Sequence, residues 1–142
     1  MKSKYFLDTC VFIYSFQKEV PNQMDKAKEL IKTTLKSNRG IISFQVIQEF
    51  LNEALYRFKQ PIKPLDCKIY ISNFLSPMCE IFPTIYLYKG AIDIGVETGL
   101  NFDMSLKVAA ALQGNTKVIY SDRFQTMFEI KGIKVINPFE GA

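Results

Sequence analysis

Short apolar stretches alternate along the chain with longer segments of helical periodicity. The apolar stretches are of strand length and lie at residues 4–7, 41–43, 80–82, 118–120 and 134–136. Between them, apolar residues recur at steps of three and four, which predicts helices at residues 22–36, 44–58, 65–74, 87–97 and 105–112. This alternation favours an α/β fold in which helices cover both faces of a central, mainly parallel sheet of about five short strands.

Proline and glycine indicate where the predicted helices begin and end. Pro64 suits the first turn of the helix at residues 65–74, which would form a helical hairpin with the helix at residues 44–58. Gly99 and Gly114 follow two other predicted helices and suit left-handed C-caps. The chain has no internal repeat, linker or low-complexity run, so its 142 residues are expected to form one domain, 1–142.

The composition is that of a globular protein. Hydrophobic residues make up 48% and charged residues 23% of the sequence, far from the values of a disordered chain. The apolar run near the N-terminus is interrupted by Asp8 and so does not resemble the core of a signal peptide. No stretch approaches the roughly 20 consecutive apolar residues that span a bilayer. We therefore expect a soluble, cytoplasmic protein with no membrane partner.

The residue types that are absent or scarce limit the chemistry. The sequence has no histidine, which excludes histidine-based triads, imidazole acid–base catalysis and histidine-bound metals. Cys10, Cys67 and Cys79 are odd in number and lack close ligand spacing, which argues against a disulfide framework and a zinc site. The net charge of +4 is compatible with a polyanionic partner but too small to identify one. Hydrolysis would have to rely on carboxylates, hydroxyls, thiols or lysines.

Four carboxylates fall near the expected carboxyl ends of the strands, where α/β folds bind ligands. Asp8 and Asp122 come directly after predicted strands. Glu49 lies in the first turns of the helix that follows another strand, and Asp103 comes just before a predicted helix. Four anions brought together repel each other unless protons or cations neutralise them. Mg²⁺ or Mn²⁺ is the expected neutraliser, because hard divalent cations prefer oxygen ligands and need no histidine.

Each of these carboxylates also has a purely structural interpretation. Asp8 could begin a turn, Asp103 could be the N-cap of the following helix, and Asp122 could open a type I turn. Glu49 lies opposite the apolar stripe of its predicted helix and could be an ordinary solvent-facing charge. Its place near the start of that helix, close to the strand ends, is what favours a functional role.

Four segments, in order along nearly the whole chain, resemble the PIN-domain ribonuclease family, which includes the toxins of virulence-associated toxin–antitoxin pairs. Phe6–Tyr14 is similar to the family's opening, where a hydrophobic strand runs into Asp-Thr, a small polar residue and an apolar run. Gly99–Ala111 is similar to the segment of the family's third acid, and Val118–Asp122 to that of its fourth. Val135–Phe139 resembles the family's terminal strand.

The resemblance implies a three-layer α/β/α domain that cleaves RNA with Mg²⁺ or Mn²⁺ and that forms a homodimer. Many bacterial and archaeal members are toxins held inactive by an antitoxin, so an antitoxin protein is a further expected partner. Carried over by position, the candidate catalytic residues are Asp8, Glu49, Asp103 and Asp122, with Asp8, Asp103 and Asp122 as the metal ligands. In such a site, metal-bound water would attack the RNA phosphodiester.

The fourth acid departs from the family pattern. The family usually places this acid two residues after Ser or Thr, whereas here Asp122 follows Ser121 directly and Arg123 takes the next position. Either the register shifts by one residue or the fourth acid is altered.

Two other functions are compatible with parts of the sequence. An aspartyl-phosphate phosphatase also has Asp at the end of its first strand, but it needs a second acid two residues later, where this chain has Cys10. A PIN-like module that has lost cleavage, and that binds only RNA or a protein partner, is the other alternative. Arg123 in the fourth-acid segment favours it.

Overall fold

The strands form one six-stranded, mostly parallel sheet with the order β3-β2-β1-β4-β6-β5. The computed structural model describes residues 3–124 and 127–140. Neighbouring strands are parallel except for the antiparallel pair of β5 and β6. The strands are β1 (Tyr5–Leu7), β2 (Gly40–Ser43), β3 (Cys79–Ile81), β4 (Val118–Tyr120), β5 (Glu129–Ile130) and β6 (Ile133–Ile136). The predicted α/β architecture with a mainly parallel sheet is confirmed.

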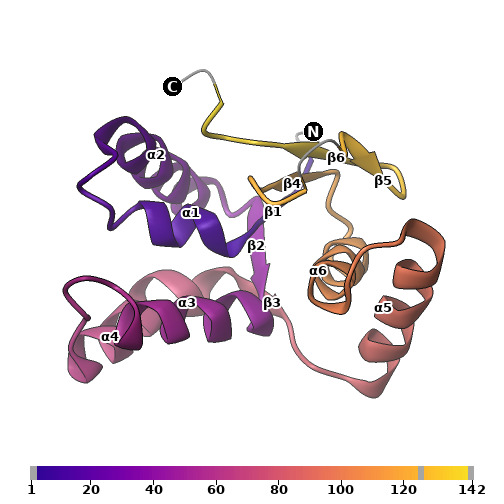
Figure 1. The fold of residues 1–142 in the computed structure, drawn as a ribbon, viewed down its shortest axis with the longest axis horizontal. Helices are drawn as coiled ribbons and strands as arrows, with labels where there is room; N and C mark the ends of the chain where they lie inside the picture. Colours follow the sequence, from indigo (N-terminus) through magenta and orange to yellow (C-terminus); the bar gives the residue numbers. More distant parts are fainter. Residues whose placement is uncertain (1–2, 125–126, 141–142) are drawn as a thin grey trace.

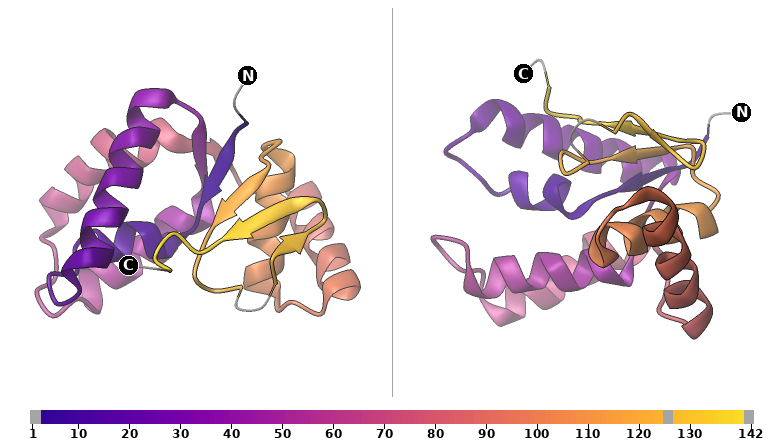
Figure 2. Two further views of the ribbon diagram at one scale, coloured as in Figure 1. Left: turned by 90° about the horizontal axis from the view of Figure 1, so that it is seen from above. Right: turned by 45° about the vertical axis from the view of Figure 1, so that its right-hand side comes forward.

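Helices surround this sheet. In Figure 1, α5 and α6 lie together below β4, β5 and β6, while α1 and α2 lie above α3 and α4. The second view in Figure 2 shows the same separation. The helices are α1 (Thr9–Tyr14), α2 (Pro21–Ser37), α3 (Phe44–Tyr56), α4 (Pro64–Tyr70), the π-helical segment η1 (Ile71–Leu75), the 3₁₀ segment η2 (Ser76–Met78), α5 (Ile85–Thr98) and α6 (Phe102–Gln113). Within residues 3–124 and 127–140, no helix is long and apolar enough to span a membrane.

Helix α1 and strand β5 were not predicted from the sequence. β5 has two residues, too few to give a periodic pattern. α1 follows β1 after a single residue and contains Val11, Phe12 and Ile13, types that favour strands over helices. Val11 and Phe12 are nevertheless fully buried in the hydrophobic core. Tertiary packing therefore outweighs local propensity at this point of the chain.

The ends of α5 and α6 test three local predictions. Gly99 has φ 79°, so the predicted left-handed C-cap is confirmed. At Gly114 the prediction is wrong, because φ is −80°. A Cβ atom at this position would meet Cδ1 of Ile41 at 2.2 Å, so that the Ile41 side chain would have to move. α6 begins at Phe102 with Asn101 as its N-cap. Asp103 is therefore inside the first turn, and its interpretation as the N-cap is wrong.

Strands β2, β1 and β4 lie side by side and parallel, so their carboxyl ends meet at one edge of the sheet. The backbone N–H of Asp8, just after β1, donates to the carbonyl oxygen of Tyr120, the last residue of β4, at 3.0 Å. Helix α3 starts directly after β2. The residues that follow these strands are therefore held close together, with α6 packed beneath the sheet (Figure 1).

Candidate functional site

Asp8 is a fully buried carboxylate at the carboxyl end of β1. It caps α1, because its Oδ1 accepts a hydrogen bond from the backbone N–H of Thr9 at 2.7 Å. Its other oxygen, Oδ2, accepts a hydrogen bond from Oγ of Ser121 at 2.6 Å. A charged group inside a protein requires such partners, because an unpaired one is strongly destabilising. Asp8 thus has a structural role as a cap and is also part of a buried polar network.

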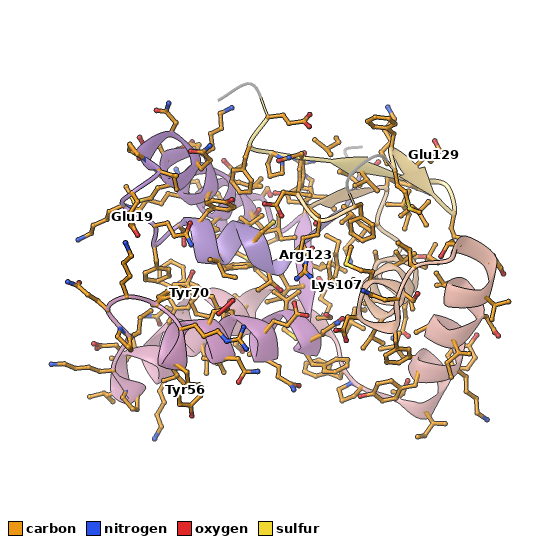
Figure 3. All side chains as sticks on the ribbon, viewed as in Figure 1. Glu19, Tyr56, Tyr70, Lys107, Arg123 and Glu129 are labelled. Carbon is orange, nitrogen blue, oxygen red and sulfur yellow. The ribbon has the colours of Figure 1, made fainter. Side chains whose placement is uncertain are left out.

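Lys107, in the middle of α6, pairs with both Asp8 and Glu49. Its side chain is 1% exposed and lies inside the molecule (Figure 3). Nζ of Lys107 lies 2.7 Å from Oδ1 of Asp8 and 2.8 Å from Oε1 of Glu49. Oγ1 of Thr9 donates to the same Glu49 oxygen at 2.5 Å. The structure therefore brings the predicted acids Asp8 and Glu49 together around one buried amine.

The amine of Lys107 keeps its positive charge. Burial lowers the pKa of this amine, but the carboxylates of Asp8 and Glu49 and the hydrogen bonds they accept outweigh burial. The resulting pKa lies above the ordinary lysine value, so Lys107 is an ammonium group at neutral pH. One positive charge therefore faces both carboxyl groups.

Sequence reasoning missed Lys107, although the sequence contains a signal for it. Lys107 is the only charged residue in residues 104–116, and it comes four positions after Asp103. A lysine in a helix normally faces solvent, which is why a helical pattern alone does not single it out. A lone charge in an apolar run, one turn from a candidate acid, is the feature that could have identified it.

Ser121 is the second participant that sequence reasoning missed. Its hydroxyl donates to Asp8 and accepts a hydrogen bond from the backbone N–H of Arg123 at 3.1 Å. Ser121 is 2% exposed, whereas Arg123 is exposed to solvent. The residue after β4 that contacts Asp8 is therefore Ser121, one position before the predicted acid Asp122.

Asp103 lies in the first turn of α6 with its side chain exposed. Its backbone oxygen accepts a hydrogen bond from Nε2 of Gln45 at 3.0 Å, which joins the start of α6 to the start of α3. The helix dipole stabilises a carboxylate in this turn. Residues four apart share a face of a helix, so Asp103 lies one turn before Lys107 on the same face of α6. The side chain of Asp103 faces solvent there, whereas that of Lys107 is buried.

Asp122 is half-buried and lies next to Cys10. Burial, followed by the charges of Asp8 and Asp122, raises the pKa of the Cys10 thiol. The thiol is therefore neutral at physiological pH and unsuited to act as a nucleophile. Cys10, Cys67 and Cys79 are all free, as the sequence predicts.

No family model matches this chain, and no curated protein matches it. Solved structures do match. A chain of the VapBC2 complex from Rickettsia felis, bound to a promoter DNA fragment, is 19% identical with a TM-score of 0.65, and the match covers 94% of this chain and 97% of that one. A chain of a toxin–antitoxin complex from Klebsiella pneumoniae is 16% identical with a TM-score of 0.68, covering 96% and 99%. VapC20 of Mycobacterium tuberculosis, a toxin that cleaves the sarcin–ricin loop, is 13% identical with a TM-score of 0.59, covering 92% and 99%.

These matches include nearly the full length of each compared chain, and the matching structures are PIN-domain proteins. This chain has the PIN-domain fold. The predicted resemblance is thereby confirmed for the fold. At this level of identity the similarity concerns architecture, and the chemistry of the PIN-domain site has to be argued from its side chains.

In this PIN-domain fold the four predicted acids do not form one cluster. Asp8 and Glu49 meet at Lys107, Asp103 faces solvent and Asp122 lies at Cys10. Within residues 3–124 and 127–140, no three Asp, Glu or Cys side chains are grouped closely enough to hold a metal ion. The oxygen donors have the chemistry that Mg²⁺ and Mn²⁺ prefer. The arrangement does not fit such an ion, because the ammonium group of Lys107 lies between Asp8 and Glu49.

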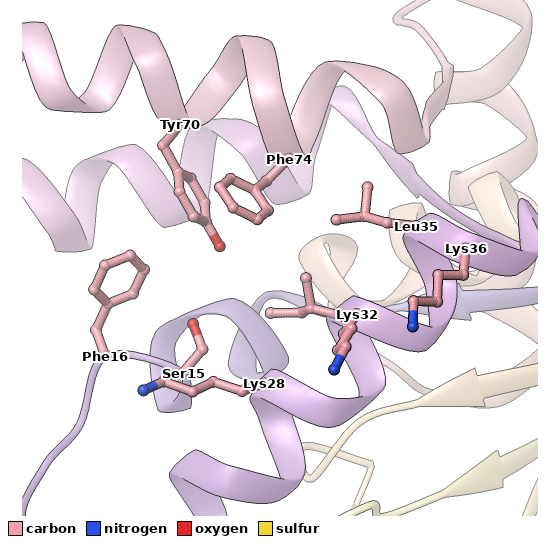
Figure 4. A pocket seen from close by; sticks show the side chains of 9 residues that line it. Ser15, Phe16, Lys28, Lys32, Leu35, Lys36, Tyr70 and Phe74 are labelled. Carbon is pink, nitrogen blue, oxygen red and sulfur yellow. The ribbon is translucent and has the colours of Figure 1, made fainter.

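An apolar groove lies on another part of the PIN-domain fold, between α2 and the segment formed by α4 and η1 (Figure 4). It has a volume of about 470 Å³. Its apolar lining comes from Phe16, Ile31, Leu35, Tyr70 and Phe74. Three exposed lysines of α2, at positions 28, 32 and 36, line it as well. An apolar groove with positive charges along one side suits an acidic, amphipathic segment.

Proposed function

We propose that this chain is a Mg²⁺- or Mn²⁺-dependent endoribonuclease that hydrolyses RNA phosphodiester bonds and acts as the toxin of a toxin–antitoxin pair. The observation that carries the proposal is the buried carboxylate Asp8 at the carboxyl end of β1, brought together with Glu49 in a PIN-domain fold. VapC20, which shares this fold, is an RNA-cleaving toxin. Because the sequence lacks histidine, carboxylates are the groups available for acid–base work.

The four carboxylates would have different roles in this reaction. Glu49 is 28% exposed and can accept a proton from water, whereas the buried Asp8 is fixed by Thr9 and Ser121. Asp8, Asp103 and Asp122 are the proposed ligands of the ion, which they would hold in an arrangement other than the one in which Lys107 pairs with Asp8. When bound, Mg²⁺ or Mn²⁺ lowers the pKa of a water molecule and stabilises the charge that develops on the phosphate.

The proposed substrate is single-stranded or looped RNA. A site at the ends of strands can admit a splayed strand, whereas duplex RNA hides its base edges in a deep, narrow groove. The test is incubation of the protein with an end-labelled hairpin RNA and Mn²⁺, with EDTA as the control. We expect cleavage in the loop that EDTA abolishes. Cleavage that persists in EDTA would show that the divalent ion is not needed, and a folded protein that cleaves none of a varied set of RNAs would contradict the proposal.

A second candidate function is an RNA- or protein-binding module that does not cleave. The observation that favours it is the ion pairing of Lys107, whose charge neutralises part of the acidic site. A gel-shift assay on the same hairpin RNA separates the two candidates. Binding without cleavage, in the presence of Mn²⁺, would identify the module.

We also propose that the groove between α2 and α4 binds an acidic, amphipathic segment of an antitoxin. The charge of Lys28, Lys32 and Lys36 supports this choice, as do the toxin–antitoxin complexes among the matching structures. The candidate partner is a small protein encoded immediately upstream. In co-expression followed by gel filtration, Lys32→Glu is expected to abolish the complex, whereas Lys117→Glu, exposed and outside the groove, should not. A complex that survives Lys32→Glu and Lys36→Glu together would exclude this groove.

Exposed apolar residues support the proposal that two copies of the chain associate. Ile85, Ile92 and Val96 are 71%, 57% and 82% exposed and share one stripe of α5. In the segment after Pro64, Leu65 and Ile69 are exposed as well. Apolar patches of this kind are common at interfaces. Light scattering should report a dimer at micromolar concentration and a monomer for Val96→Lys; a monomeric parent would refute the proposal.

A further inference from the structure

Lys107 lies where a cation is expected between two of the proposed acids. Its side chain is 1% exposed, and Nζ contacts Oδ1 of Asp8 and Oε1 of Glu49 at 2.7 and 2.8 Å. The neighbouring oxygens are engaged as well, since Ser121 donates to Oδ2 of Asp8 and Thr9 donates to Oε1 of Glu49. The charge of the acid pair is therefore already partly neutralised, and its oxygens are hydrogen-bonded, by groups of the chain itself.

The geometry makes Lys107 and a divalent ion competitors for the same oxygens. A divalent ion bound to Oδ1 of Asp8 or Oε1 of Glu49 would lie within a few ångströms of the ammonium group, and like charges at that distance repel strongly in a buried site. Burial also keeps the Lys107 amine away from a bound RNA phosphate in this arrangement, so the lysine is placed to neutralise the acids rather than to hold substrate.

The Lys107 ion pairs lie close to the solvent edge of the site. A lysine carries its charge on a flexible four-carbon stem, and Asp103 lies one turn earlier on the same face of α6, at the solvent side. Glu49 is 28% exposed, so solvent reaches this edge of the network.

We propose that Lys107 is a built-in counter-ion that keeps Asp8 and Glu49 closed to divalent cations. This inference rests on the proposed function, since Asp8 is one of the proposed metal ligands of that nuclease. It makes metal affinity, and not only cleavage, depend on Lys107.

The test measures Mn²⁺ binding by isothermal titration calorimetry on the folded protein without RNA. The parent is expected to bind Mn²⁺ weakly. Lys107→Met, which removes the charge but keeps an unbranched side chain that is one atom shorter, is expected to bind it at least about tenfold more tightly. Lys107→Arg keeps the charge and should bind as weakly as the parent. Lys131→Met removes an exposed lysine that pairs with Glu97 and is the matched control, with no expected change. Adding Asp8→Asn to Lys107→Met should remove the gain.

The outcomes separate this inference from the proposed function. Mn²⁺ affinity that is equal in the parent and Lys107→Met, or undetectable in both, would overturn the inference, even if the parent cleaves RNA. Tighter binding by Lys107→Met with no RNA cleavage by any variant would support the inference and refute the nuclease. If Lys107→Met does not fold, Lys107→Gln provides the same comparison, because glutamine is neutral but can still hydrogen-bond to both carboxylates.

Discussion

Replacing Asp8 with asparagine is expected to lower the rate of RNA cleavage by about a thousandfold, which corresponds to ~4 kcal/mol of transition-state stabilisation. Asparagine keeps the shape of the side chain but removes a charge that contacts Lys107 and accepts hydrogen bonds from Thr9 and Ser121. Asp122→Asn should cost no more than about tenfold, because Lys107 pairs with Asp8 and Glu49, whereas Asp122 lies beside Cys10. The measurement is single-turnover cleavage of a labelled hairpin RNA with Mn²⁺.

The controls for this comparison distinguish chemistry from folding. Asp66→Asn changes an exposed carboxylate in the first turn of α4 and should cleave like the parent. Circular dichroism of each variant shows whether it is folded. Full cleavage by a folded Asp8→Asn variant would indicate a contaminating nuclease. A larger loss for Asp122→Asn than for Asp8→Asn would reverse the assigned ranking of the two acids.

Lys107→Met is expected to lower the free energy of unfolding by about 3–5 kcal/mol. The change leaves Asp8 buried and deprived of its positive partner, and the loss of one member of a buried ion pair is far more costly than the net value of the pair. Lys131→Met removes an ion pair at the surface, 2.6 Å from Glu97 with both side chains partly exposed, and should cost about 0–1 kcal/mol. Urea denaturation measures both, as a shift of the midpoint at constant slope.

A double substitution tests whether the cost comes from the uncompensated charge. Combining Lys107→Met with Asp8→Asn removes both charges. The double variant should therefore lose less unfolding free energy than the sum of the losses of the two single variants. Additive losses would mean that Lys107 stabilises the core through packing of its stem and not through its charge. In Lys107→Met alone, Mn²⁺ should restore part of the lost stability, since a ligand bound only by the native state stabilises it.

These measurements would together show how the site trades the free energy of unfolding against affinity for a divalent ion. A fully buried carboxylate that is stabilised by a lysine favours a stable fold, whereas the same carboxylate in a metal site must release that lysine. Substitutions that weaken the ion pair should therefore reduce stability and raise metal affinity at the same time. Such opposition between stability and function is common where charged groups are buried for chemistry.

Several features of this protein follow from the sequence alone. Short apolar runs and helical periodicity are local patterns that decide which side chains can be buried. The structure therefore has these elements close to their predicted positions: β1 to β4, β6 and helices α2 to α6. Parallel neighbouring strands end at one edge, and this rule brings the residues after β1 and the helix after β2 together. Asp8 and Glu49 are near each other for that reason.

Only the tertiary structure determined what neutralises these acids. Lys107 belongs to a helix whose pattern is apolar. Whether its ammonium group meets water or Asp8 depends on how α6 lies relative to Asp8 and α3, which no local pattern encodes. The same holds for α1, whose residues favour a strand but form a helix because Val11 and Phe12 are buried. Contacts between residues about a hundred positions apart, such as Ser121 with Asp8, arise from packing and lie beyond any sequence window.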